Sequence, residues 1–128
     1  MNMNMNVMLE QMCYIEDGDI VLNYSQFKLI ASKHTYTMVL QFICNVVDNL
    51  LKFKSQLIIH IDMQKLTIGD IDKHYAFMKH LSQYMQTMYP NKLAKCYIYK
   101  APFVFSKLYK LVSLCIDKDT LQKIEMVN

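Results

Sequence analysis

The 128-residue sequence contains no arginine, so all 14 of its basic residues are lysines, and its formal net charge is +3. Arginine makes most of the bidentate contacts to bases and phosphates in nucleic-acid complexes, so we expect no nucleic-acid partner. The small excess of lysine fits weak attraction to anionic lipid surfaces, and ordinary solubility explains it equally well. A sequence without arginine and rich in Met, Asn, Lys, Ile and Tyr also indicates an AT-rich genome, as in a virus or parasite.

Glycine is almost as scarce, because Gly18 and Gly69 are the only two in the chain. A dinucleotide-binding loop or a P-loop needs several closely spaced glycines, so neither motif is present. No serine stands in the Gly-x-Ser-x-Gly pattern of an α/β-hydrolase. We therefore expect a protein that is not an enzyme and that carries no cofactor.

The four cysteines show no metal-binding or disulfide pattern. No two of them form Cys-x-x-Cys, and three lie in apolar periodic segments, as buried thiols do in a reducing compartment. His60 and Asp62 lie two apart, but a zinc site needs three or four convergent ligands, and a histidine satisfied by a neighbouring side chain is the simpler interpretation. The chain has neither an apolar run near the ~20 residues of a membrane span nor a signal-peptide pattern. We expect a cytoplasmic protein without a metal.

Strand and helix patterns alternate along the rest of the chain. Strand patterns cover residues 19–24, 56–62, 95–99 and 123–127, and amphipathic helix patterns begin near Thr35, Asp70 and Phe103. Such alternation predicts an α/β fold with a mainly parallel β-sheet and helices packed on it. We expect a flexible segment over residues 1–16, a single domain over residues 17–128, a turn at Asp17-Gly18 and a loop over residues 25–33.

The segment from Tyr89 to Ile124 carries a family resemblance. It combines Tyr89-Pro90, Tyr97-Ile98-Tyr99, Ala101-Pro102-Phe103, Phe105, Tyr109, Asp117, Thr120 and Lys123-Ile124. In this order and spacing, these residues resemble the second half of a CRAL-TRIO domain, the lipid-binding domain of the yeast phosphatidylinositol transfer protein and its relatives. The resemblance implies a protein that binds a phosphoinositide or another hydrophobic ligand.

Three departures from the family pattern stand out. Residues 62–67 match the loop after a family strand, but Lys65 replaces a glycine, which predicts backbone strain if that position has a positive φ. Lys100 replaces an asparagine before Ala-Pro, and Gly18 lacks the Arg-Pro that accompanies it in the family.

The resemblance also implies elements at both ends of the domain. Family members have a helical segment before it and an apolar gate helix after the last strand, whereas this chain has about sixteen residues before Asp17 and ends at Asn128. We therefore expect a minimal domain with an open apolar face. Another chain covers that face, or the chain folds differently there, or the lipid cavity has been lost. A dimer that closes the open face is the expected assembly.

Two sets of residues are candidates for the ligand site. Tyr97 and Tyr99 alternate onto one sheet face, and we expect them to form an apolar floor with residues of the neighbouring strand and of the following helix. The candidate floor residues are Ile59, Ile61, Tyr97, Tyr99, Phe103, Phe105 and Tyr109. The candidates for a lipid headgroup or membrane surface are Lys107, Lys110, Lys118 and Lys123. Ordinary core packing and a solvated helix face are the alternatives for the two sets.

A second functional interpretation keeps the fold without the ligand. The BCH-type domains of GTPase regulators are similar to the CRAL-TRIO family and act largely through protein contacts. By this comparison the chain would be a non-enzymatic interaction module that has lost its lipid cavity. It would then self-associate or bind a protein partner.

Overall fold

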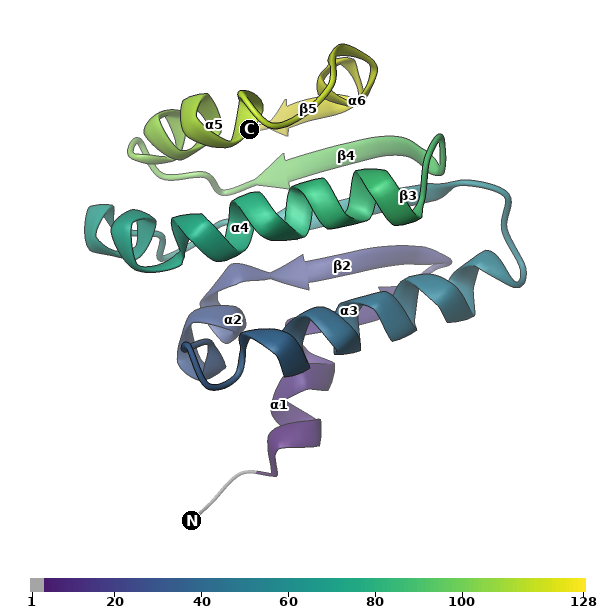
Figure 1. Cartoon of the computed structure of the whole chain (residues 1–128), viewed down its shortest axis with the longest axis horizontal. Helices are drawn as coiled ribbons and strands as arrows, with labels where there is room; N and C mark the ends of the chain where they lie inside the picture. Colours follow the sequence, from purple (N-terminus) through teal and green to yellow (C-terminus); the bar gives the residue numbers. More distant parts are fainter. Residues whose placement is uncertain (1–3) are drawn as a thin grey trace.

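Five strands form one sheet in the order β1-β2-β3-β4-β5 in the computed structural model, which describes residues 4–128 (Figure 1). Strands β2 to β5 are parallel and β1 is antiparallel to β2, which confirms the predicted α/β fold with a mainly parallel sheet. The strands are β1 (Cys13–Glu16), β2 (Asp19–Asn23), β3 (Leu57–Asp62), β4 (Leu93–Tyr99) and β5 (Ile124–Val127).

The predicted flexible segment over residues 1–16 is wrong for the described part of its length. Helix α1 (Met5–Met12) begins at Asn4, whose side chain accepts a hydrogen bond from the Asn6 amide. Leu9 and Met12 of this helix are buried in the core, and β1 follows directly. This apolar burial orders the segment. Residues 1–3 of the predicted flexible segment lie outside the described residues.

A tight turn joins β1 to β2 at the expected place. Asp17 and Gly18 have φ angles of 52° and 81°, the left-handed backbone that two-residue hairpin turns require. The turn brings Glu16 opposite Asp19 and so sets the register of the only antiparallel pair among the described strands.

The predicted loop over residues 25–33 is also wrong, because helix α2 (Tyr24–Ile30) occupies most of it. The Asn23 side chain caps this helix by accepting a hydrogen bond from the Gln26 amide at 3.2 Å. Tyr24, Phe27 and Ile30 recur every three residues and are buried. This short apolar stripe is the sequence signal that was missed.

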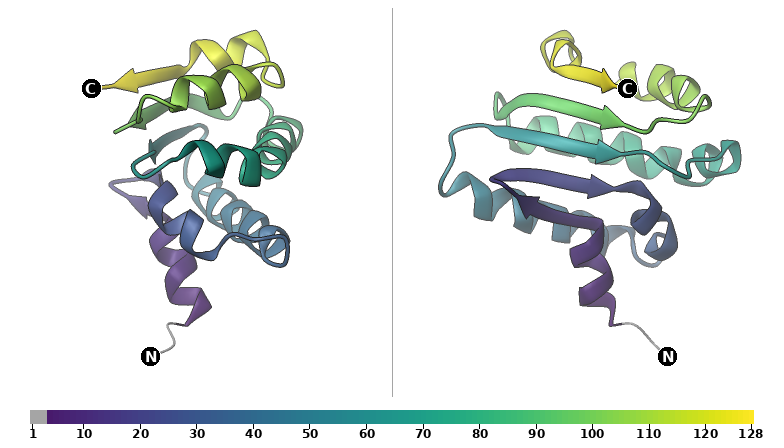
Figure 2. Two further views of the ribbon diagram at one scale, coloured as in Figure 1. Left: turned by 90° about the vertical axis from the view of Figure 1, so that its left-hand side faces the viewer. Right: turned by 180° about the vertical axis from the view of Figure 1, so that it is seen from behind.

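The helices that connect the parallel strands lie together on one side of the sheet. They are α3 (Tyr36–Leu51), α4 (Ile68–Met88), α5 (Phe105–Ser113) and the short α6 (Lys118–Gln122). Figure 2 shows the opposite side of the sheet turned toward the viewer in its right-hand view, with α3 and α4 behind the strands. The apolar sheet face is thus covered by the chain's own helices, and we call it the inner face.

Helix α4 begins with a reciprocal cap. Thr67 accepts from the Asp70 amide at 3.3 Å, and the Asp70 carboxylate accepts from the Thr67 amide at 3.0 Å. The helix, predicted to begin near Asp70, thus begins at Ile68, and Asp70 is its third residue. No helix within residues 4–128 combines the length and apolarity that a membrane crossing requires.

Candidate functional site

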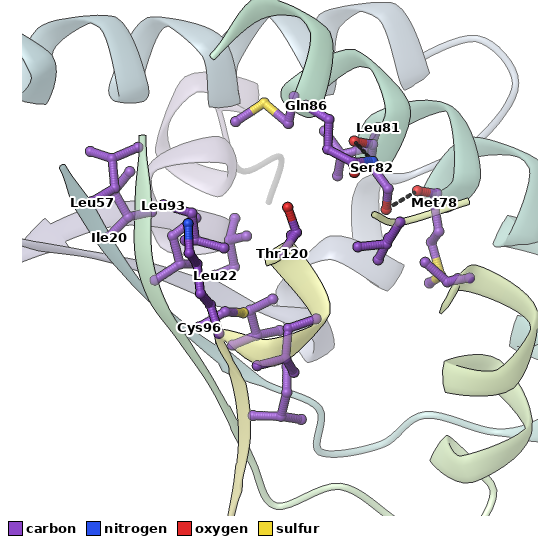
Figure 3. A pocket seen from close by; sticks show the side chains of 18 of the residues that line it. Ile20, Leu22, Leu57, Met78, Leu81, Ser82, Gln86, Leu93, Cys96 and Thr120 are labelled. Atoms are coloured by element: carbon purple, nitrogen blue, oxygen red, sulfur yellow. Dashed lines mark hydrogen bonds between the residues drawn. The ribbon is translucent and has the colours of Figure 1, made fainter. Parts of the chain in front are cut away.

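A cavity of about 590 Å³ lies between the inner face of the sheet and the helices (Figure 3). Its floor consists of alternate residues of three neighbouring parallel strands, because every second side chain of a strand points to the same face. These residues are Ile20 and Leu22 of β2, Leu57, Ile59 and Ile61 of β3, and Cys96 and Ile98 of β4.

The walls of the cavity are helical and mostly apolar. Met78, Leu81 and Met85 extend from α4, and α5 adds side chains from its inward side. The α5 residues are Phe105, Leu108, Tyr109 and Val112. Methionine is unbranched and adapts to irregular shapes, so the α4 wall can adjust to a hydrophobic occupant.

Polar residues gather at one end of the cavity, where α4 meets the turn between α5 and α6. The Gln86 amide nitrogen donates to the carbonyl oxygens of Ser82 and Cys115, each at 3.0 Å. The Gln86 side-chain oxygen accepts from the Asp117 amide at 3.0 Å. Gln86 therefore ties α4 to the α5–α6 turn and shapes this end of the cavity.

Helix α6 is capped at this polar end. The Asp117 carboxylate accepts from the Thr120 amide at 2.8 Å, and this hydrogen bond lowers the pKa of Asp117. Thr120 lines the cavity beside Lys118 and Lys123. Asp117 and Asp119 line the same end, so a hydroxyl, two lysines and two aspartates lie where the apolar lining ends.

The structure separates the four candidate lysines into two pairs. Lys118 and Lys123 line the polar end of the cavity, as described above. Lys107 and Lys110 are exposed on the outward side of α5 and do not line it. Only the first pair can contact a ligand in the cavity.

Only some of the candidate floor residues line the cavity. Ile59, Ile61, Phe105 and Tyr109 line the cavity, whereas Tyr97, Tyr99 and Phe103 do not. The β3–β4 register pairs Ile59 with Cys96 and His60 with Tyr97, so Tyr97 and Tyr99 lie on the opposite, outer face of the sheet. The prediction of one floor shared by Ile59, Ile61 and the two tyrosines is therefore wrong.

Phe103 is 99% exposed in the loop before α5. The residues missed by sequence reasoning are Cys96 and Ile98, which alternate with the tyrosines along β4. Their apolar character was the available signal. Alternation alone could not show which of the two sets faces the helices.

The outer face holds a polar cluster around His60. Its Nε2 atom lies 2.8 Å from an Asp19 carboxylate oxygen, and its Nδ1 atom lies 2.6 Å from the Tyr99 hydroxyl. The Tyr97 ring stacks on the imidazole with 5.4 Å between ring centroids. Both imidazole nitrogens thus have neighbouring partners. Residues 4–128 contain no group of three or more His, Cys, Asp or Glu side chains placed to hold a metal ion.

A second histidine is buried inside the fold, since His74 of α4 is only 1% exposed. Its Nδ1 atom lies 2.7 Å from the Tyr36 hydroxyl, and its ring packs edge-on against Phe27. Burial, with a further effect of Lys73, lowers the pKa of His74. The neutral imidazole therefore links α3 to α4 and is not in the cavity lining.

Comparisons with known proteins agree with this architecture. Residues 5–128 match the model of the CRAL/TRIO domain. The SEC14 cytosolic factor of Yarrowia lipolytica is 29% identical over 66 residues, which are 52% of this chain and 13% of that protein. The Sec14 cytosolic factor of Schizosaccharomyces pombe is 28% identical over 67 residues, which are 52% of this chain and 23% of that protein.

A solved structure has the same fold over nearly the whole chain. The crystal structure of Sfh5 superposes with a TM-score of 0.78 at 16% sequence identity, over 98% of this chain and 49% of that one. The matches to the two curated relatives span less than a quarter of either protein's length. The family match itself covers almost all of this sequence, from residue 5 to the last residue. The chain therefore belongs to the CRAL/TRIO domain family.

Proposed function

We propose that this protein binds a lipid in the cavity between the inner sheet face and helices α4 and α5. The observation that carries the proposal is the division of this cavity into a long apolar part and one polar end. Its volume of about 590 Å³ is typical of small-molecule sites, which span roughly 300–1,000 Å³. Apolar burial at about 25 cal/mol per Å² would supply most of the affinity.

The division of the lining sets the orientation of the ligand. Acyl chains would lie along Ile59, Ile61 and Ile98, against the methionines of α4. An anionic headgroup would lie near Thr120, Lys118 and Lys123, where two ammonium groups can bind phosphate oxygens. A phosphoinositide combines these features, and we propose it as the ligand class. Two relatives are named cytosolic factors, and we place this protein in the cytosol as well.

Lipid uptake from vesicles tests the proposal. The protein is incubated with phosphatidylcholine vesicles that contain phosphatidylinositol, the vesicles are sedimented, and lipid bound to the soluble protein is measured by mass spectrometry. Wild type should retain phosphatidylinositol. K118Q/K123Q should retain less of it, while K107Q/K110Q, an equal charge change outside the cavity, should match wild type. Folded protein that takes up no lipid would refute the proposal.

A second candidate function is self-association, which one feature of the sheet favours. Strand β5 pairs only with β4 among the described strands, so its other edge can accept a strand from a second copy. Met126 of β5 is 51% exposed beside this edge. Light scattering at several protein concentrations, with M126K as the variant, tests a dimer through β5; a constant monomer mass would exclude it.

A further inference from the structure

The cavity differs in chemistry at the two ends of the parallel strands. Its polar end, where Gln86 meets the α5–α6 turn, lies before the amino end of β5. Its other end lies beyond the carboxyl end of β2, which α2 follows directly. Figure 1 shows α2 and α6 beyond opposite ends of the strands. A chain-like ligand with its polar group near Gln86 would therefore extend along the strands toward α2.

Two stacked phenyl rings stand at the end near α2. Phe27 of α2 and Phe77 of α4 both line the cavity, and their ring centroids lie 5.6 Å apart with 22° between the ring planes. Tyr36 of α3 also stacks on Phe77, at 4.6 Å and 11°, and the His74 ring packs edge-on against Phe27. Neighbours from other helices thus hold both rings in place. We call Phe27 and Phe77 the aromatic wall.

The aromatic wall and the polar end are about one acyl chain apart. Phe77 and Gln86 are separated by nine residues of α4, which is about 14 Å at the rise of an α-helix. Met78, Leu81 and Met85 line the cavity between them, and Figure 3 shows the first two on α4. One chain of a membrane lipid crosses one leaflet, which is half of a hydrocarbon core of ~30 Å. An extended chain of that length therefore fits between the wall and Gln86.

The volume of the cavity limits the ligand to one such chain. A water molecule takes up about 30 Å³ of liquid, and a methylene group is of similar size, so about 590 Å³ holds roughly 20 methylene-sized groups. One extended chain with part of its headgroup fills this room. Two chains of the same length with a headgroup exceed it. The second chain of a diacyl lipid would stay outside, with its apolar surface unfavourably in water.

We propose that the cavity takes a lipid with a single acyl chain, and that the aromatic wall sets the longest chain it accepts. The ligand class is a single-chain phosphoinositide, of which lysophosphatidylinositol is the simplest. The width of the cavity can adapt, because Met78 and Met85 are flexible side chains, whereas the stacked rings fix its length. The inference rests on the proposed function and names the lipid class that the same cavity takes.

Binding of lysophosphatidylinositols with acyl chains of graded length tests the inference. Isothermal titration is carried out below the concentration at which each lipid forms micelles. For wild type, each further buried methylene should tighten binding about fourfold, until the chain reaches the aromatic wall and the gain stops. A gain that continues through the longest chains would overturn the proposal.

Two substitutions should move this limit in opposite directions. F77L replaces a ring of the wall by a smaller side chain and should admit longer chains. L81F places a ring between the wall and Gln86 and should admit only shorter ones. F53L and L29F make the same exchanges at exposed positions outside the cavity and should keep the wild-type limit.

Thermal melting shows which of these variants are folded. The ring of L81F enters open space, so this variant decides the test if F77L does not fold. An unchanged limit in every folded cavity variant would overturn the role of the aromatic wall. The same shift in the control variants would overturn it as well.

Native mass spectrometry separates this inference from the proposed function. The protein is incubated with phosphatidylcholine vesicles that contain equal amounts of phosphatidylinositol and lysophosphatidylinositol, the vesicles are sedimented, and each complex with one lipid is identified by its mass. We expect the complex with lysophosphatidylinositol to predominate. Equal or greater retention of phosphatidylinositol would overturn the single-chain inference and support the proposed function. The absence of both complexes would overturn both proposals.

Discussion

Ile59 of β3 and Cys96 of β4 lie opposite each other on the inner face, and the next pair, His60 and Tyr97, lies on the outer face. The first pair belongs to the cavity floor, and the second pair is stacked outside it. A step of one residue along the strands therefore separates the floor of the cavity from a polar surface cluster.

This relationship predicts different effects on lipid uptake for two neighbouring substitutions. C96F extends a phenyl ring into the cavity and should reduce lipid uptake severalfold. Because the ring enters open space, its cost in the free energy of unfolding should stay at or below the 1–3 kcal/mol of ordinary overpacking. Y97F changes the outer face and should leave uptake unchanged. Uptake and thermal melting of both variants check the prediction, and equal uptake by C96F and wild type would contradict it.

Removal of the Gln86 side chain should loosen the polar end of the cavity. Q86A loses one donated and one accepted hydrogen bond between α4 and the α5–α6 turn, and one donated bond to Ser82 within α4. We expect a loss of about 1–3 kcal/mol in the free energy of unfolding. Q83A, at an exposed position of the same helix, is the control and should melt within about 0.5 kcal/mol of wild type. Amide hydrogen exchange in α6 should be faster in Q86A than in wild type. Unchanged exchange there would show that the Gln86 hydrogen bonds do not hold α6 in place.

Acid should destabilise the fold through His74. Because burial lowers the pKa of His74 below 6.5, the unfolded chain binds a proton more readily than the folded one as the pH falls. Its contribution to the free energy of unfolding is complete above pH ~6.5 and declines below that value until the pH reaches the folded-state pKa.

Melting curves between neutral and mildly acidic pH measure this slope. H74Q should show a smaller decline of melting temperature than wild type over this range, even if its stability at neutral pH is lower. H34Q, at an exposed histidine, should keep the wild-type slope. An undiminished slope in H74Q would assign the pH dependence to other groups.

Lys65 should be a strained position, as its replacement of a family glycine predicts. Its φ is +74°, a left-handed conformation that disfavours side chains with a Cβ atom. The Lys65 carbonyl oxygen accepts from Lys28 Nζ at 2.8 Å, and glycine would keep this backbone acceptor. K65G should therefore raise the free energy of unfolding by up to about 1 kcal/mol, reduced in part by the greater freedom of glycine in the unfolded chain.

Lys52 provides the contrasting position for this substitution. It follows α3 with a φ of −69°, so K52G relieves no strain and should lower stability by about 0.5–1 kcal/mol. Chemical denaturation of both variants checks the sign. A loss of stability in K65G as large as in K52G would show that the positive φ costs the protein little.

The sequence alone predicted the fold class and the family. The alternation of strand and helix patterns requires only local periodicity, and the residues from Tyr89 to Ile124 match the family by type and spacing. Four of the candidate floor residues, Ile59, Ile61, Phe105 and Tyr109, line one cavity, because apolar residues on strands and helices of an α/β fold turn toward a common interior. That they bind a ligand stays a prediction.

Predictions from the local sequence were wrong where the placement of a side chain depends on contacts between distant segments. The two-residue period of a strand predicts that Tyr97 and Tyr99 share one sheet face. Whether that face is the inner or the outer one depends on the register with β3 and on the side of the sheet where the helices pack. Residues 5–16 are ordered because Leu9 and Met12 pack into the core, and this burial depends on the rest of the fold. Likewise Lys118 and Lys123 line the cavity while Lys107 and Lys110 face solvent, because the turn after α5 redirects the chain toward the polar end of the cavity.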